Sequence, residues 1–297
     1  TLLLNISQFQ TLTGQEAFAE YGAQLSAELK KQLPSAAARN AVVISLQNEF
    51  FLNGNHHPFG PTRTGTVTLG DGITYDMTSA KDRQQAADAN TNRWATRTRA
   101  EIKKHLPNTL VTVGVFTYNA VHKQGANGLI LKGCNAPPTA NRVTAGEHES
   151  TIAVMAPPVD CRFPARPLWL AQAGLDFLDV HIYQEDGSLS GLDANLRTEE
   201  WTMIQNKTPV MMGEFGCNSN WGVNATTCGP HVRELQMSSC KRGFVAWLFW
   251  TYDCEEQTGG WINMRDGNGA IDNVLAPRLN PDPCRTYSYE ASYEVLP

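Results

Sequence analysis

Apolar runs and amphipathic segments alternate along the chain. Six largely apolar runs without regular polar alternation are candidate strands: residues 1–6, 41–46, 109–116, 177–182, 209–213 and 244–250. Between them, apolar positions recur at helical spacing in residues 15–32, 91–106, 168–173, 198–205 and 231–240. Because such runs suit parallel strands covered on both faces, this rhythm predicts an α/β fold.

The connections differ in length according to their direction. Those that follow a candidate strand are long, at residues 50–90, 117–167, 184–197, 217–230 and from 253 onward, whereas helix-to-strand connections are short. This asymmetry is typical of a TIM (β/α)8 barrel with its functional loops on the C-terminal face. No G-x-G-x-x-G or P-loop motif follows a strand, which disfavours a nucleotide-binding sheet.

We therefore expect a single barrel domain over residues 1–297, with residues 276–297 as a tail wrapping its surface. Within the first long connection, residues 64–77 alternate and turn at Gly70-Asp71-Gly72, which predicts a β-hairpin.

Composition narrows the classes of partner. Of 297 residues, 41% are hydrophobic and 18% are charged, as in a globular protein, and the net charge is −5. This net negative charge does not favour binding to nucleic-acid phosphates. The apolar runs are too short to cross a bilayer. We expect neither a nucleic-acid nor a membrane partner, and the oligomeric state stays open.

Seven cysteines suggest disulfides and thus a secreted protein. Cys217 and Cys228 bracket one loop, and Cys134 and Cys161 bracket another. The odd count leaves one thiol free or paired with sequence outside this chain. Metal binding is the alternative, but no C-x-x-C occurs, and neither His56-His57 nor Glu147-His148-Glu149 has the spacing of a zinc helix. We expect no metal and no cofactor.

Two carboxylates stand at the ends of candidate strands. Residues 44–50 read Ile-Ser-Leu-Gln-Asn-Glu-Phe, and residues 210–216 read Val-Met-Met-Gly-Glu-Phe-Gly. A glutamate at the C-terminal end of a barrel strand points into the mouth, where the active sites of that fold lie. Cleavage of a glycosidic bond needs two such groups, one protonated and one ionised. Glu49 and Glu214 are therefore candidate catalytic residues; the alternative is that each is a structural carboxylate.

These two endings resemble those of the retaining, two-glutamate glycoside hydrolases with (β/α)8 barrels, especially the cellulase/mannanase-type family 5 and its relatives. In that superfamily Asn-Glu closes the fourth strand and the nucleophilic glutamate closes the seventh. The sixth strand commonly ends in His-x-Tyr, as at His181 and Tyr183, and the eighth presents a sugar-stacking tryptophan, as at Trp250. The resemblance covers about residues 1–252.

The resemblance implies a role for each matched residue. Glu49 would be the general acid/base and Glu214 the nucleophile. The substrate-binding residues would be Asn48 at the sugar 2-hydroxyl, His181 beside sugar or carboxylate, Tyr183 donating to Glu214, and Trp250 stacking on a pyranose. For His181 and Trp250 the alternative is ordinary core packing. Four further aromatics in strand-end loops are candidate sugar platforms or scattered surface residues: Phe50, Trp221, Tyr252 and Trp261.

The implied activity is that of an endo-β-1,4-glucanase or mannanase working by double displacement. One feature departs from the family pattern. Counting back from Glu49 makes residues 41–46 the fourth strand and residues 1–6 the third, so the first two βα units are missing, with the arginine that usually comes from them. The explanations are a shortened chain, an open barrel, a complementing chain or a different strand count. The second function is accordingly a catalytically impaired barrel that acts as a carbohydrate-binding or scaffold protein.

Overall fold

A computed structural model describes residues 9–54, 56–59, 65–116, 162–183, 204, 207–252, 259–275 and 284, with two short strands, β7 (Ala140–Asn141) and β8 (Val154–Met155). The predicted strand at residues 1–6 and helix at 198–205 lie outside these residues, except for Ile204. The predicted tail, residues 276–297, also lies outside them apart from Cys284.

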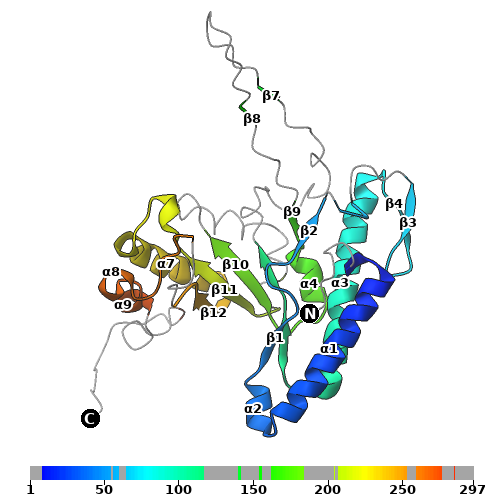
Figure 1. The fold of residues 1–297 in the computed structure, drawn as a ribbon, viewed down its shortest axis with the longest axis horizontal. Helices are drawn as coiled ribbons and strands as arrows, with labels where there is room; N and C mark the ends of the chain where they lie inside the picture. The colour runs from blue at the N-terminus through cyan, green and yellow to red at the C-terminus, as the bar shows by residue number, and fades with distance from the viewer. Residues whose placement is uncertain are drawn as a thin grey trace, which may run out of the picture.

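A parallel sheet forms the centre of the fold (Figure 1). β12 (Phe244–Phe249), β11 (Val210–Gly216), β10 (Leu178–Tyr183) and β6 (Gly114–Phe116) pair in that order. β5 (Leu110–Thr112) lies one residue before β6 and pairs in parallel with β1 (Val43–Ser45).

Taken together, five parallel segments lie side by side in the order in which they occur in the sequence, matching five of the six predicted strands. The strand order does not reverse within these described segments, whereas it would at the switch point of a doubly wound sheet. The mixed α/β class is confirmed.

Helices begin at capping side chains. α1 (Leu12–Gln32) starts after Thr11, α3 (Ala80–His105) after Ser79 and α7 (Ala225–Cys240) after Asn224, and each of these caps accepts a hydrogen bond from a first-turn backbone N–H. All three helices start earlier than their apolar periodicity predicts. The shorter helices are α2 (Ala36–Asn40), α4 (Pro167–Gln172), α8 (Asp266–Gly269), α9 (Asp272–Leu275) and the 3-10 turn η3 (Ser219–Trp221).

Besides the pair β7–β8, two antiparallel ribbons lie in the connections that follow β1 and β6. β3 (Thr66–Thr68) and β4 (Thr74–Asp76) form the hairpin predicted for residues 64–77. β2 (Phe51–Asn53), directly after Glu49, pairs with β9 (Arg162–Pro164). β9 thereby holds the chain beyond Glu49 against the segment that leads into α4.

The core lies between the sheet and its helices, and α1 packs along α3 beside it (Figure 1). Trp94 of α3 is fully buried and stacks on Phe50 with 4.8 Å between ring centroids, and Phe9 packs against both. Phe50 is only 1% exposed. Its predicted role as a sugar platform is therefore wrong, because the ring that follows Glu49 turns into the core.

Disulfides join two cysteine pairs among the described residues. The predicted pair Cys217–Cys228 links the end of β11 to α7 and encloses η3. A second pair, Cys240–Cys284, had no signal in the sequence. Cys134 and Cys161 lie outside the described residues. None of the described helices is both long and apolar enough to cross a membrane.

Candidate active site

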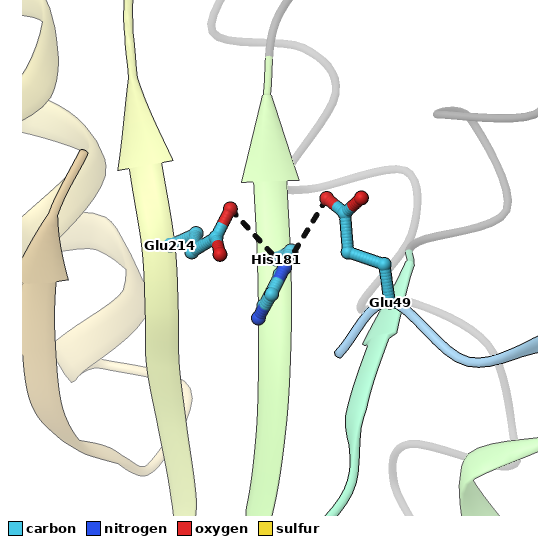
Figure 2. A group of neighbouring side chains, drawn as sticks. All are labelled: Glu49, His181 and Glu214. Atoms are coloured by element: carbon cyan, nitrogen blue, oxygen red, sulfur yellow. Dashed lines mark hydrogen bonds and ion pairs between the residues drawn. The ribbon is translucent and has the colours of Figure 1, made fainter. Parts of the chain in front are cut away.

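Four of the residues predicted for the site meet at the C-terminal ends of neighbouring strands, and Figure 2 shows three of them, Glu49, His181 and Glu214. His181 and Tyr183 lie on β10, and Glu214 of β11 is the register partner of His181. Glu49 lies beyond the end of β1, across His181 from Glu214. Parallel strands end at the same edge of a sheet, so residues 165 positions apart in the sequence come together there.

His181 lies between the two glutamates. Its Nδ1 atom is 3.3 Å from Glu49 Oε1 and 3.3 Å from Glu214 Oε2. The Tyr183 hydroxyl donates a 2.6 Å hydrogen bond to Glu214 Oε2. Side-chain exposure is 2% for His181, 15% for Glu214 and 31% for Glu49, so the histidine is enclosed while Glu49 is the most open of the three.

The backbone at Glu49 is left-handed, with φ of 44°. For a residue with a Cβ this conformation costs about 1 kcal/mol or more, and such strain gathers at functional sites. Gly114 on β6 holds the bend, because its N–H donates to the Gln47 carbonyl and its carbonyl accepts from the Phe50 N–H. A Cβ at Gly114 would lie 3.0 Å from His181 Nε2, so glycine also makes room for the ring.

Charge and burial act against each other at His181. Burial lowers the pKa of the ring, but the contacts with Asp179 and Glu49 and the negative charges of Glu214 and Asp179 outweigh it and raise that pKa to about 9. The ring is therefore a cation at neutral pH. Burial and the charges of Glu49 and Asp179 raise the pKa of Glu214 above its ordinary value, and the Tyr183 hydrogen bond and the His181 charge offset only part of that rise. Burial and the bond to Glu214 raise the pKa of Tyr183, so its hydroxyl stays a proton donor.

Glu49, His181 and Glu214 offer atoms within 4.8 Å of one another, a spacing that a metal ion could also bridge. A metal ion there would have to displace the proton that the raised pKa of His181 keeps on Nδ1, whereas the ion pairs of the three side chains form without one. We therefore interpret the cluster as an acid–base group joined by ion pairs.

The other two predicted site residues flank the cluster. Asn48 is exposed beside Glu49. Trp250 is half-buried at the end of β12, and its backbone N–H donates to the Phe215 carbonyl of β11. Their contacts with sugar stay predictions.

Two of the candidate platforms lie next to Tyr183. The centroid of the Trp261 ring is 4.9 Å from that of Tyr183, and the Trp221 ring packs against both. The loops that carry the two tryptophans are joined by hydrogen bonds, including Ser219 N–H to the Gly260 carbonyl and Ile262 N–H to the Cys217 carbonyl. Tyr252 is 58% exposed and lies against Arg265. Trp221 and Trp261 thus form an aromatic wall next to the residue that binds Glu214.

Sequence reasoning missed one acid of the site. Asp179 is two residues before His181 on the same face of β10, and its Oδ1 lies 3.8 Å from His181 Nε2. The motif Asp-x-His-x-Tyr contained the signal, because alternate residues of a strand share a face.

The comparisons with known proteins do not establish a family. No protein-family model and no curated protein matches the sequence. Similar solved structures include an agarase, AgWH50C, at 13% identity and a TM-score of 0.49, covering 91% of this chain and 40% of that one. Another is the exo-β-1,4-mannosidase Op5Man5 from Opitutaceae bacterium strain TAV5, at 16% identity and a TM-score of 0.41, covering 81% and 33%. A third is the endo-1,4-β-mannanase of Rhizomucor miehei, at 15% identity and a TM-score of 0.33, covering 63% and 44%.

The chain thus spans less than half the length of each of these proteins. Their names are those of glycoside hydrolases, the class that the strand-end motifs predict. At TM-scores below 0.5 the likeness carries no functional argument, which has to come from the site itself.

Proposed function

We propose that this chain is the catalytic barrel of a retaining glycoside hydrolase, with Glu49 as general acid/base and Glu214 as nucleophile. The observation that carries the proposal is the spacing of the two carboxylates, which have oxygens within 4.8 Å of each other. Retaining enzymes hold their carboxyl groups about 5–5.5 Å apart, whereas inverting enzymes leave about 6.5–9.5 Å for a water molecule. The spacing favours direct attack by one carboxylate.

The chemistry follows in two steps. Protonated Glu49 gives its proton to the glycosidic oxygen as the Glu214 carboxylate attacks the anomeric carbon, so that the leaving sugar departs and a glycosyl ester forms on Glu214. Glu49, now a carboxylate, then takes a proton from water, which attacks the same carbon and frees Glu214. The Tyr183 hydrogen bond and the His181 cation favour the ionised form of Glu214 that this attack needs.

The proposed substrate is a β-linked polysaccharide, of the β-1,4-glucan or mannan type that the sequence resemblance implies. The aromatic wall of Trp221 and Trp261 supports a carbohydrate, because the apolar face of a pyranose packs on aromatic rings. The two disulfides support a secreted enzyme acting on an extracellular polymer.

The proposed architecture is a (β/α)8 barrel, of which the five parallel segments form a part. On the face opposite the helices, Val43, Leu110 and Leu248 are 51%, 44% and 56% exposed. These positions alternate with buried ones such as Ile44 and Val111. A closed barrel would bury this face in its interior, and it would pair the outer edges of β1 and β12, which have no partner strand within the described residues.

The deciding experiment is hydrolysis of a panel of soluble β-glucans and β-mannans by the purified chain, beside Glu214→Gln and Glu49→Gln. Glu101→Gln, on the outer face of α3, is the matched control. We expect both site variants to lose at least about 1,000-fold in kcat, since each removes a group used in every turnover. The first product, followed by NMR, should keep the β configuration.

An inverted first product would refute the role of Glu214 as nucleophile. Binding of a polymer by all variants without turnover by any, wild type included, would replace the enzyme with a carbohydrate-binding protein.

A further inference from the structure

We propose that Asp179 is a positioning residue of this site, whose buried carboxylate holds the His181 ring as a cation with its Nδ1–H between Glu49 and Glu214. The kinetic part of this inference rests on the proposed function. The placement of the ring does not, because it follows from contacts on β10 and β11.

Asp179 is enclosed and short of partners. The residue is 9% exposed, and its Oδ1 makes no hydrogen bond within the described residues. A buried carboxylate needs a counter-charge or donors to offset the loss of water. The group that faces it is His181 Nε2, at 3.8 Å, on the side of the ring away from the two glutamates.

Space for this carboxylate is built into the neighbouring strand. Gly213 on β11 lies directly against Asp179, and a Cβ at Gly213 would overlap the carboxylate. Glycine in the interior of a strand costs backbone entropy and leaves nothing to pack. Here the carboxylate of Asp179 occupies the space that a side chain at position 213 would fill, so the position of Asp179 depends on glycine at 213.

The charges of the site explain what the pair does. Three carboxylates face the ring: Glu49 after β1, Asp179 on β10 and Glu214 on β11. Tyr183, also on β10, acts on Glu214. Asp179 and the His181 cation cancel each other. Double displacement requires one of the two glutamates to be protonated and the other ionised, and the Nδ1–H that lies between them can donate to the ionised one.

The test is Asp179→Asn, which keeps the shape and removes the charge. We expect NMR titration to show the pKa of His181 falling from about 9 toward its ordinary value of 6.5. We expect kcat to fall roughly 10- to 100-fold with KM unchanged, by analogy with the carboxylates that orient metal-binding histidines. The acidic limb of kcat/KM should move to lower pH, because below about pH 6.5 the ring keeps its positive charge while the negative charge of Asp179 is gone, which lowers the pKa of the neighbouring acids.

Asp176→Asn is the matched control. Asp176 precedes the same strand and is also partly enclosed, but it pairs with Arg99 and Lys103 of α3. Its loss should lower stability without moving the pKa of His181 or the pH profile.

A His181 pKa unchanged in Asp179→Asn, or an unchanged kcat in an otherwise active enzyme, would overturn the inference. If the variant fails to fold, the wild type still decides: ¹⁵N chemical shifts showing a neutral His181 ring at pH 7.5 would reject it, and a doubly protonated ring would support it. The two proposals can also fail separately. If the wild type is inactive on every polymer but the pKa of His181 still falls in Asp179→Asn, the proposed function is refuted and the placement of the ring stands.

Discussion

The fit between Gly213 and Asp179 makes a quantitative prediction for Gly213→Ala. Every atom of the Asp179 carboxyl group would lie within 2.7 Å of the new Cβ, closer than real Cβ contacts come. Because the carboxylate is buried, it can move only by leaving His181. Overpacking of this kind costs about 1–3 kcal/mol. Without the clash, alanine would instead stabilise the protein by about 0.4–1 kcal/mol, through the entropy of the unfolded chain.

A double-mutant cycle separates these two effects. Gly213→Ala is measured in the wild type and in Asp179→Ala, where the methyl group enters the space that the carboxylate has left. We expect it to destabilise the first by about 2 kcal/mol and to be neutral or stabilising in the second, a coupling energy of about 2 kcal/mol. Urea unfolding followed by tryptophan fluorescence and by circular dichroism gives the midpoints, and coincidence of the two probes checks the two-state assumption.

Additivity within about 0.5 kcal/mol would refute the reasoning, because it would mean that Gly213 and Asp179 do not share a space. Gly22→Ala is the control for the cycle. Gly22 lies on α1, against Thr98 and Ile102 of α3, and should be additive with Asp179→Ala.

Three further predictions concern charge and cross-links. Tyr183→Phe removes a hydrogen bond that lowers the pKa of Glu214, so that pKa rises and the acidic limb of kcat/KM moves to higher pH; an unmoved limb would contradict this. The pKa of His181 is about 9 in the folded protein against 6.5 for a free ring, so the protonated ring stabilises the fold. This stabilisation is complete below pH 6.5 and is lost as the pH rises through 9. Wild type should therefore lose about 3 kcal/mol relative to His181→Gln over that window, measured by urea unfolding at each pH, and parallel curves would refute it. Replacing Cys217 and Cys228 by serine removes a disulfide of sequence separation 11, so the urea midpoint should fall by the equivalent of about 3 kcal/mol. The value of kcat/KM should fall as well, because Trp221 lies inside the loop that the disulfide closes. An unchanged midpoint would show that other contacts hold the loop.

Much of the sheet could be predicted from the sequence because its strands are apolar on both faces. β10 and β11 stand out as runs bounded by polar loops, and the chemistry-bearing residues His181 and Glu214 lie within or at the end of those runs. Their convergence followed from a single assumption, that the strands are parallel and neighbouring. The closed barrel stays a prediction, because the described strands form only a sheet.

The errors have physical causes as well. The first eleven residues of α3, up to Asn90, lacked a helical apolar stripe because the positions they bury are small or polar, among them Ala86, Ala87 and Asp88. The cap at Ser79, followed three residues later by Asp82, was the signal available. Phe50 was misjudged because it was taken to belong to a strand-end loop that lines the cleft, whereas the chain bends at Glu49 and the next ring is buried in the core.

That bend has a consequence for anyone improving the protein by selection. A population screened for heat tolerance alone would gain from asparagine or glycine at position 49, since both accept a left-handed backbone and neither adds a second carboxylate beside Glu214. Each such winner would lack the general acid that we propose at this position. Selection for thermal stability and selection for activity therefore favour different residues at position 49. A library screened for stability should keep glutamate there.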